Sequence, residues 1–470
     1  MLAGSGLFAG SLDYLSNQSA KFLMNMSRNA STDSADIVHY NPAGAARLPK
    51  GLSVDLSGQT LFKYYDNEDT RFGLATGISS LIGTASLPDT EKTLSQDYPT
   101  PVLPNLYLAY NFGEMGPGKL AAYLQVGIVA GGGELQWKNG TAGTTLLLSG
   151  IAIKVAGNSG APLNGYAQPV LIGNGIKSQE FTASSIYYGI GVGAAYAFLD
   201  DMVSVSLGCR TVMAQRSFEL EATYGSNQTL SGKYEYDAMG FTPIIGINVK
   251  PTKELTLAAR FEVETALEFE YKQKKLNSSN TTLLLPVATG TLKNSGIEDG
   301  KKTRQDLPHI IGLGANYKVN DELTVDLSGT IYMLSNANLG HVYDSATGNK
   351  AGKVNEYFGT GWEVGLGATY KVIKELKVGI GCLYTESGAK KSYLNDIKTA
   401  FNASANPLLD SIAVGLGANY AVLENLDVTL SLLGTHYLPE NFSLNAGAFK
   451  VSGKYAKDVI DIAYGVSYKL

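Results

Sequence analysis

The chain has 470 residues, of which 54 are glycine, 28 are tyrosine and 2 are tryptophan, and its formal net charge is −5. Charged residues make up only 17% of the chain, against ~25% in typical soluble proteins. This composition argues against a soluble multidomain enzyme, and the chain is too apolar and aromatic to be disordered. It also has no basic run that would bind nucleic acid.

The first fifty residues are mostly small and polar and have no strand pattern. The start lacks the basic stretch and apolar run of a signal peptide. The chain is therefore either cytoplasmic or a mature protein whose signal has been removed. The strand pattern described next favours the mature protein.

The rest of the chain is dominated by alternation of apolar and polar residues, which is typical of strands with two unlike faces. From 255 to 271 the odd positions are almost all apolar and the even positions carry most of the charge, which predicts one strand of seventeen residues. Shorter stretches at 323–331 and 426–432 repeat the pattern. A soluble sandwich and a membrane barrel both show such alternation, so strand length and turns must decide between them.

The connections between these strands alternate strictly between short and long. Six tight turns are expected near 113–118, 200–201, 251–253, 320–321, 373–374 and 424–425. Seven long polar connections lie at roughly 66–100, 138–183, 223–236, 273–302, 336–355, 387–407 and 439–456. Thirteen connections join fourteen strands, and short turns on one side with long loops on the other are typical of bacterial outer-membrane barrels.

We therefore predict an all-β fold, with residues 51–470 forming a 14-stranded antiparallel transmembrane β-barrel in the outer membrane of a Gram-negative bacterium. A barrel of this size is too wide for its own side chains to fill. We predict that residues 1–50 form a hatch that plugs it. A Gly-x-Gly-Ala-x-Tyr repeat precedes four of the turns. Its tyrosines are expected in the aromatic girdle and its glycines on the lumen face, where they save space.

The segment Tyr40-Asn41-Pro42-Ala43-Gly44, just before the first strand, resembles the FadL/TodX family of outer-membrane transporters. The likeness extends to 102–105 and 306–308, and the strand count and hatch length also fit. The resemblance implies porin-like passive uptake of hydrophobic small molecules, namely fatty acids, detergents or hydrocarbons. Extracellular loops would capture the ligand, a lumen pocket would hold it, and a gap in strand three would release it sideways.

The predicted barrel and the resemblance to this family together give candidate site residues. Asn41, Pro42 and Ala43 would anchor the hatch, and Gly131, Gly132 and Gly133 would interrupt strand three at the lateral opening. Apolar residues of the following loop would form the capture groove, although packing against one another is the alternative; we single out Leu147, Leu148, Ile151 and Ile153. The ligand pocket would include Arg210, Gln215, Arg216 and Arg260, where an arginine pairs either with a carboxylate ligand or with Glu262 or Glu264.

No nucleophile motif, metal spacing or cofactor motif is present, so we expect a protein that is not an enzyme. The expected partners are the hydrophobic ligand, outer-membrane lipid and lipopolysaccharide, and the expected state is a monomer. Cys209 and Cys382 are either a disulfide or plain packing residues. Two other functions stay open, a general porin for polar solutes and an adhesin or receptor barrel. A porin would lack an ordered plug, and an adhesin would lack an apolar capture groove.

Overall fold

The computed structural model describes residues 18–74, 92–158, 176–224, 227–344, 346–446 and 449–470. All of its strands but two form one antiparallel β-barrel, which closes where β1 (Gly51–Leu74) pairs with β20 (Phe449–Lys469). The other two, β13 (His341–Tyr343) and β14 (Lys350–Lys353), form a separate two-stranded sheet. The barrel has fourteen strands, which confirms the count predicted from the turns. Four of the fourteen are interrupted, so that two consecutive segments form one barrel strand: β2 (Lys92–Gln96) with β3 (Thr100–Met115), β8 (Leu255–Glu262) with β9 (Glu268–Ser278), β10 (Lys302–Arg304) with β11 (Ile310–Lys318), and β18 (Leu426–Tyr437) with β19 (Glu440–Ala446).

The remaining elements follow in chain order. The other strands are β2 (Lys92–Gln96), β3 (Thr100–Met115), β4 (Gly118–Trp137), β5 (Ile176–Phe198), β6 (Val203–Tyr224), β7 (Thr229–Val249), β8 (Leu255–Glu262), β9 (Glu268–Ser278), β10 (Lys302–Arg304), β11 (Ile310–Lys318), β12 (Leu323–Tyr332), β13 (His341–Tyr343), β14 (Lys350–Lys353), β15 (Gly361–Lys371), β16 (Leu376–Glu386), β17 (Ser411–Leu423), β18 (Leu426–Tyr437) and β19 (Glu440–Ala446). The helices are α1 (Ala20–Asn25), α2 (Ile37–Tyr40), η2 (Pro42–Arg47), α4 (Ala142–Asn158), α6 (Leu284–Asn294), η3 (Leu334–Asn336), η4 (Val354–Tyr357), α7 (Lys391–Asn395) and α8 (Ala400–Ala405).

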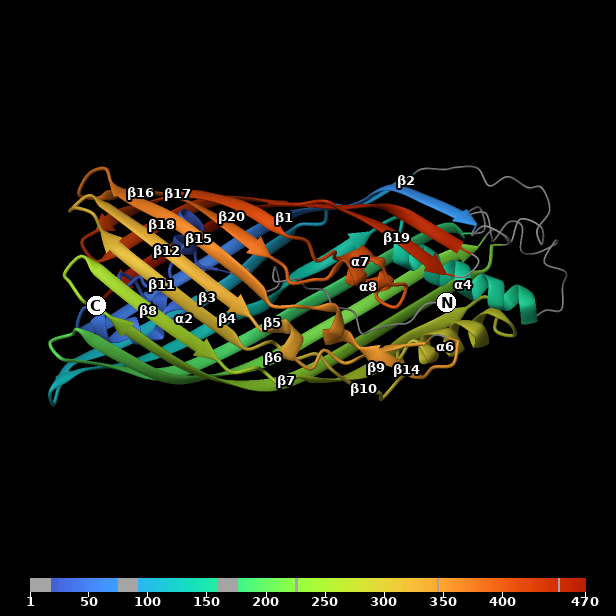
Figure 1. Cartoon of the computed structure of the whole chain (residues 1–470), viewed down its shortest axis with the longest axis horizontal. Helices are drawn as coiled ribbons and strands as arrows, with labels where there is room; N and C mark the ends of the chain where they lie inside the picture. The colour runs from blue at the N-terminus through green and yellow to red at the C-terminus, as the bar shows by residue number, and fades with distance from the viewer. Residues whose placement is uncertain (1–17, 75–91, 159–175, 225–226, 345, 447–448) are drawn as a thin grey trace.

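The two ends of the barrel differ as expected. The tight turns gather at one end, together with α2, while helices α4, α6, α7 and α8 lie at the other (Figure 1). The predicted long loops were drawn too wide, because several strands extend well into them. The expected loop at 223–236, for example, is largely strand, since β6 runs to Tyr224 and β7 begins at Thr229. Among the described helices, none is both long and apolar enough to cross a bilayer.

The polarity of the barrel wall inverts along its length. Near the turns, outward residues are apolar and inward residues are polar: in β6, Leu207 is 69% exposed while Ser206 is buried. Nearer the loops, the same strand turns Gln215 outward and buries Phe218. The turn half therefore presents an apolar band suited to lipid, and the loop half has the apolar interior of a soluble domain. Cys209 and Cys382 are free thiols.

The seventeen-residue strand predicted at 255–271 is wrong. The ladder stops after Glu262 and resumes at Glu268, and the intervening residues form only an isolated bridge between Thr265 and Leu307. This irregular stretch shifts the side-chain parity, because one residue of slip exchanges the two faces of a strand. Odd positions thus face outward in β8, where Leu257 is 41% exposed, and inward in β9, where Phe269 is buried.

Candidate functional site: the N-terminal segment, the break in β4 and the central cavity

Residues 18–50, called here the N-terminal segment, lie inside the barrel and are almost entirely buried. Helix α1 contacts β1, β15, β16, β17, β18 and β20, while η2 contacts β3, β4, β5, β6 and β7. The side chain of Asn29 reaches the remaining side, where its amide donates to the carbonyls of Leu313 (3.0 Å) and Gly329 (3.3 Å). The segment therefore touches nearly the whole circumference of the wall. Residues 1–17 of the predicted hatch lie outside the described residues.

Glycines on the lumen face of β15, β16 and β17 allow helix α1 to approach the wall closely. A Cβ at Gly367 or Gly381 would overlap the backbone carbonyl oxygen of Asn25, and one at Gly415 would overlap that of Leu23. The glycines of β15, β16 and β17 thus form a shallow trough that lets the backbone of α1 lie directly against the wall. The sequence predicted that these glycines save space, but not that α1 occupies that space.

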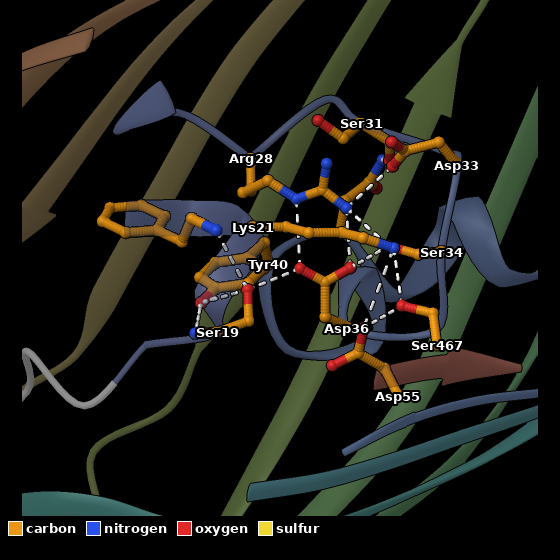
Figure 2. Close-up of polar contacts among 12 residues, drawn as sticks. Ser19, Lys21, Arg28, Ser31, Asp33, Ser34, Asp36, Tyr40, Asp55 and Ser467 are labelled. Atoms are coloured by element: carbon orange, nitrogen blue, oxygen red, sulfur yellow. Dashed lines mark hydrogen bonds and ion pairs between the residues drawn. The ribbon is translucent and has the colours of Figure 1, made fainter. Parts of the chain in front are cut away.

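A polar network of buried side chains fixes the segment internally and to the wall (Figure 2). Arg28 Nη2 pairs with Asp36 Oδ1 at 2.6 Å and with Asp33 Oδ1 at 2.7 Å. Asp36 also accepts a hydrogen bond from the Ser19 hydroxyl at 2.6 Å. The link to the wall is Lys21, whose ammonium donates to Ser467 Oγ at 2.7 Å and lies 3.8 Å from Asp55. A buried ion pair tolerates the loss of one partner poorly, so this network holds the segment in one position.

The predicted anchor residues lie at the centre of the segment. Asn41 is buried and its amide donates to the carbonyl of Ser31 at 3.3 Å, which closes the segment on itself. Pro42 begins η2 and, with Ala43, lies close to Gly246 of β7. The hydrogen bonds to the wall come instead from residues the sequence analysis missed, above all Lys21, Asn25, Asn29 and Arg47.

Two of the predicted pocket arginines lie together beneath His39 in a small polar cavity that also contains Glu262. Arg210 forms an ion pair with Glu262, and Arg260 Nε lies 3.4 Å from the same carboxylate. Arg260 also donates to the His39 carbonyl. Burial lowers the pKa of His39 to about 3, and the two arginines act in the same direction, so its ring is neutral at physiological pH. The guanidinium groups of Arg210 and Arg260 therefore already interact with the Glu262 carboxylate, and that of Arg260 also with the N-terminal segment.

The other two predicted pocket residues behave differently. Gln215 is exposed on the outer face of β6, so it cannot line the lumen, and the prediction is wrong; it follows the outward parity of Val205 and Leu207. Arg216 is buried in the loop half, where it donates to Gln305. Its guanidinium carbon lies 5.2 Å and 5.8 Å from the ring centroids of Tyr236 and Phe269. A ligand carboxylate at Arg216 would have to compete with these contacts.

The predicted glycines coincide with an irregularity in β4, the third barrel strand. β4 pairs with β3 only as far as Gly127, opposite Asn105, and no β3 partner is present for residues 128–137 in the described ladder. On the other side, its register with β5 shifts twice between Ile128 and Gly133. Gly131 and Gly133 have φ values of +92° and +78°, which side chains other than glycine rarely adopt. The edge of β3 here also lacks two amide donors, because residues 101 and 104 are prolines.

Side chains from the lumen and the neighbouring strands fill this break, which we call the β4 break (residues 128–133). Lys63 of β1 is buried and its ammonium donates to the carbonyls of Gly132 (2.8 Å) and Glu134 (2.6 Å). Thr100 Oγ1 also donates to the Gly132 carbonyl at 2.6 Å. Ile128 packs with Leu61 and Leu103 in a small apolar cluster. The break therefore has a polar lock on its lumen side and an apolar filling between β3 and β4.

A cavity in the middle of the lumen reaches this break. This central cavity is lined by Phe22, Leu23 and Met26 of the N-terminal segment and by Gly132 and Gly133 of β4. The wall contributes apolar residues such as Leu433 and Val459 and polar residues such as Asn406. Lys63, Glu363 and Asp461 are the charged members of the described lining. On the turn side of α1, a separate polar vestibule contains Lys21, Asn25 and Arg28. Helix α1 thus stands between the apolar cavity and the vestibule.

The predicted capture groove is not open at these residues. Leu147, Leu148 and Ile151 are buried, because residues 142–158 form helix α4, which packs against α6 and α8. The side chain of Ile153 lies outside the described part. The sequence analysis assumed an irregular loop, whereas a helix can bury its apolar side chains against neighbouring helices. Packing of the apolar residues, the alternative left open above, is what the described side chains show.

Filling the glycine trough is expected to displace α1 from the wall. Replacing Gly367 with valine would place side-chain atoms where the Asn25 carbonyl lies, and such overpacking typically costs ~1–3 kcal/mol. We expect the N-terminal segment of Gly367→Val to be displaced, seen as faster amide hydrogen exchange in residues 18–30. Gly434→Val is the matched control, because no atom lies within 4 Å of a Cβ there. Equal protection in both variants would show that the trough does not hold α1.

The chain is similar to known outer-membrane proteins in sequence and in fold. The family model for outer membrane protein transport protein (OMPP1/FadL/TodX) matches residues 182–469. The crystal structure of a Pseudomonas aeruginosa FadL homologue is similar over 99% of both chains, with a TM-score of 0.67 and 14% identity. The P. putida toluene transporter TodX has a TM-score of 0.55 and 12% identity over 94% of this chain and 96% of that one. The Ralstonia pickettii toluene transporter TbuX also scores 0.55, with 11% identity over 98% and 100%. No curated protein matches the chain by sequence.

Proposed function

The chain belongs to the outer membrane transport protein family OMPP1/FadL/TodX, and from this premise we propose that it carries hydrophobic small molecules from the central cavity out through the β4 break. The family assignment makes the chain a transporter of the bacterial outer membrane and not an enzyme. The path through the molecule is our proposal. In it, the N-terminal segment is a hatch, the central cavity holds the ligand, and the break opens sideways into the membrane.

The observation that carries this proposal is the contact between the central cavity and the β4 break. A strand edge without partners is expensive in hydrocarbon, because its amide and carbonyl groups have no water to bind. Here Lys63 and Thr100 satisfy the Gly132 carbonyl from inside, and Ile128 and Leu103 fill the gap with side chains rather than backbone. Side chains rearrange more easily than a hydrogen-bonded ladder, so this is the place in the wall where a ligand could pass.

The closed axial route supports a sideways exit. Helix α1 separates the central cavity from the polar vestibule at the turn end, and both its internal network and the glycine trough hold it there. A hydrophobic ligand that moved along the barrel axis would have to cross the charged groups of the vestibule, whereas an exit through the β4 break leads from apolar cavity to apolar lipid.

Uptake by intact cells tests this function. We expect a strain that lacks its own hydrophobic-compound transporters to accumulate radiolabelled hexadecanoate or toluene faster when it produces this chain. The purified protein should show little ion conductance in planar bilayers. High conductance without hydrophobic uptake would indicate a general porin instead. An adhesin or receptor barrel would show neither property.

A further inference from the structure

Among the described residues that line the central cavity, Lys63 is the one cationic side chain, and the sequence analysis did not single it out. We propose that Lys63 is a head-group site for an anionic amphiphile, which binds there with its tail in the cavity and its head at the mouth of the β4 break. This inference rests on the proposed function and selects, among hydrophobic ligands, those with a carboxylate.

The electrostatics of the lumen favour Lys63 over the arginines. Arg210 and Arg260 share the carboxylate of Glu262, and Arg260 also donates to a carbonyl of the N-terminal segment. Lys63 is 2% exposed and, within the part of the chain that the structure describes, forms no ion pair. The carboxylates of Glu134 and Asp461 attract this ammonium without forming an ion pair with it. Burying a charge that has no direct counter-ion is costly, and an incoming anion in contact with it would relieve that cost.

The hydrogen-bonding capacity of Lys63 also fits. An ammonium has three donors. Two of them are used by the carbonyls of Gly132 and Glu134, which leaves one for a ligand oxygen without disturbing the break. Ionised acceptors form shorter and stronger hydrogen bonds than neutral carbonyls do. A carboxylate that drew the ammonium fully toward itself would release both carbonyls and loosen the lock on the β4 break.

The rest of the lining confines the head group to this place. Glu363 is acidic and would repel an anion from its part of the cavity. Asp461 lies opposite Leu61 on the ladder and acts electrostatically on Lys63, so a ligand carboxylate would bind on the side of Lys63 away from Asp461. Apolar side chains of α1, namely Phe22, Leu23 and Met26, offer a surface for the tail. Leu61 adjoins Lys63 on the same face of β1 and continues the apolar lining into the cluster with Leu103 and Ile128. A ligand whose carboxylate binds Lys63 would therefore contact apolar side chains of α1 in the cavity and the apolar cluster of Leu61, Leu103 and Ile128 at the β4 break.

Binding of a matched pair of probes to the purified full chain tests the proposal. Hexadecanoate and hexadecan-1-ol have the same tail, and only the first carries a charge. We expect Lys63→Met to weaken hexadecanoate binding at least about tenfold, equivalent to ~1.4 kcal/mol, and to leave hexadecan-1-ol within about twofold. Lys63→Gln keeps an N–H donor for the β4 carbonyls without the charge, and should give the same result if Lys63→Met fails to assemble.

Lys457 provides the matched control. Lys457 is as buried as Lys63 and lies nearby, since it pairs on the ladder with Tyr65 of the strand that carries Lys63. Its ammonium, however, donates to Asn406 (2.9 Å) and lies over the rings of Tyr65 and Tyr437. Lys457→Met should leave hexadecanoate binding within about threefold. An equal loss for both probes in the Lys63 variants, or an equal effect of Lys457→Met, would overturn the head-group site. Wild-type protein that binds neither probe would instead contradict the proposed function.

Discussion

Replacing Gly131 and Gly133 with valine is expected to reduce hydrophobic uptake at least about tenfold while the barrel still assembles. Both glycines have positive φ values, which valine adopts only with strain because its branched side chain clashes with the backbone. A Cβ at Gly131 would overlap the Ser185 carbonyl, and one at Gly133 would lie 2.7 Å from Thr100 Oγ1. The double variant must therefore abandon the observed break, either for a regular strand or for another distortion.

Gly132→Ala is the matched control for this experiment. Gly132 does not have a positive φ, and a Cβ there would meet no atom within 4 Å, so the break should persist and uptake should stay near the wild-type rate. Uptake of labelled hexadecanoate by cells would be compared with binding by purified protein. Loss of uptake with retained binding supports an exit at the β4 break. Wild-type uptake by the double variant, with a structure showing β4 fully paired to β3, would rule that exit out.

Deleting residues 1–48 is expected to turn a nearly closed barrel into an ion-conducting pore. The fourteen-stranded wall cannot fill its own lumen, and the N-terminal segment occupies the turn half of it. We expect the single-channel conductance in planar bilayers to rise by about tenfold or more, as for wider open barrels. Heat-modifiable migration in gels would verify that the deleted protein still forms a barrel. An unchanged conductance in an assembled barrel would show that the segment is not the plug.

Two aspartates provide a finer version of the same test. Asp36 is fully buried and binds Arg28, Ser19 and Ser34. The side chain of Asp33 is 55% exposed, and among the described residues its one ion-pair partner is Arg28. Removing one partner of a buried ion pair typically costs ~3–5 kcal/mol, and exposed pairs contribute far less. Asp36→Ala should therefore produce frequent opening events, while Asp33→Ala should remain close to wild type. Equal behaviour of the two variants would mean that this network does not hold the segment closed.

The sequence alone was sufficient for the architecture. Period-two alternation and the order of short and long connections depend only on neighbouring residues, and they predicted the fourteen strands and the outer-membrane location, both of which are confirmed. The family, which is also confirmed, was predicted from the resemblance at residues 40–44. The three glycines at 131–133 were also recognisable locally, because glycine weakens any strand in which it stands. The boundary at Gly51, where the first strand begins, follows from the same pattern.

The tertiary structure decided which side chains meet in the lumen. Gln215 was misplaced because it was taken from the resemblance to the family, whereas its parity with Val205 and Leu207 places it on the outer face. The strand predicted at 255–271 was wrong because an irregular stretch after Glu262 reverses the parity without any local sign of it, so that Phe269 faces inward. Lys63 could not be linked to the β4 break, since the two lie on non-adjacent strands about seventy residues apart. Such contacts depend on closure of the barrel around the N-terminal segment, and only the closed barrel brings α1, β1 and β4 to one cavity.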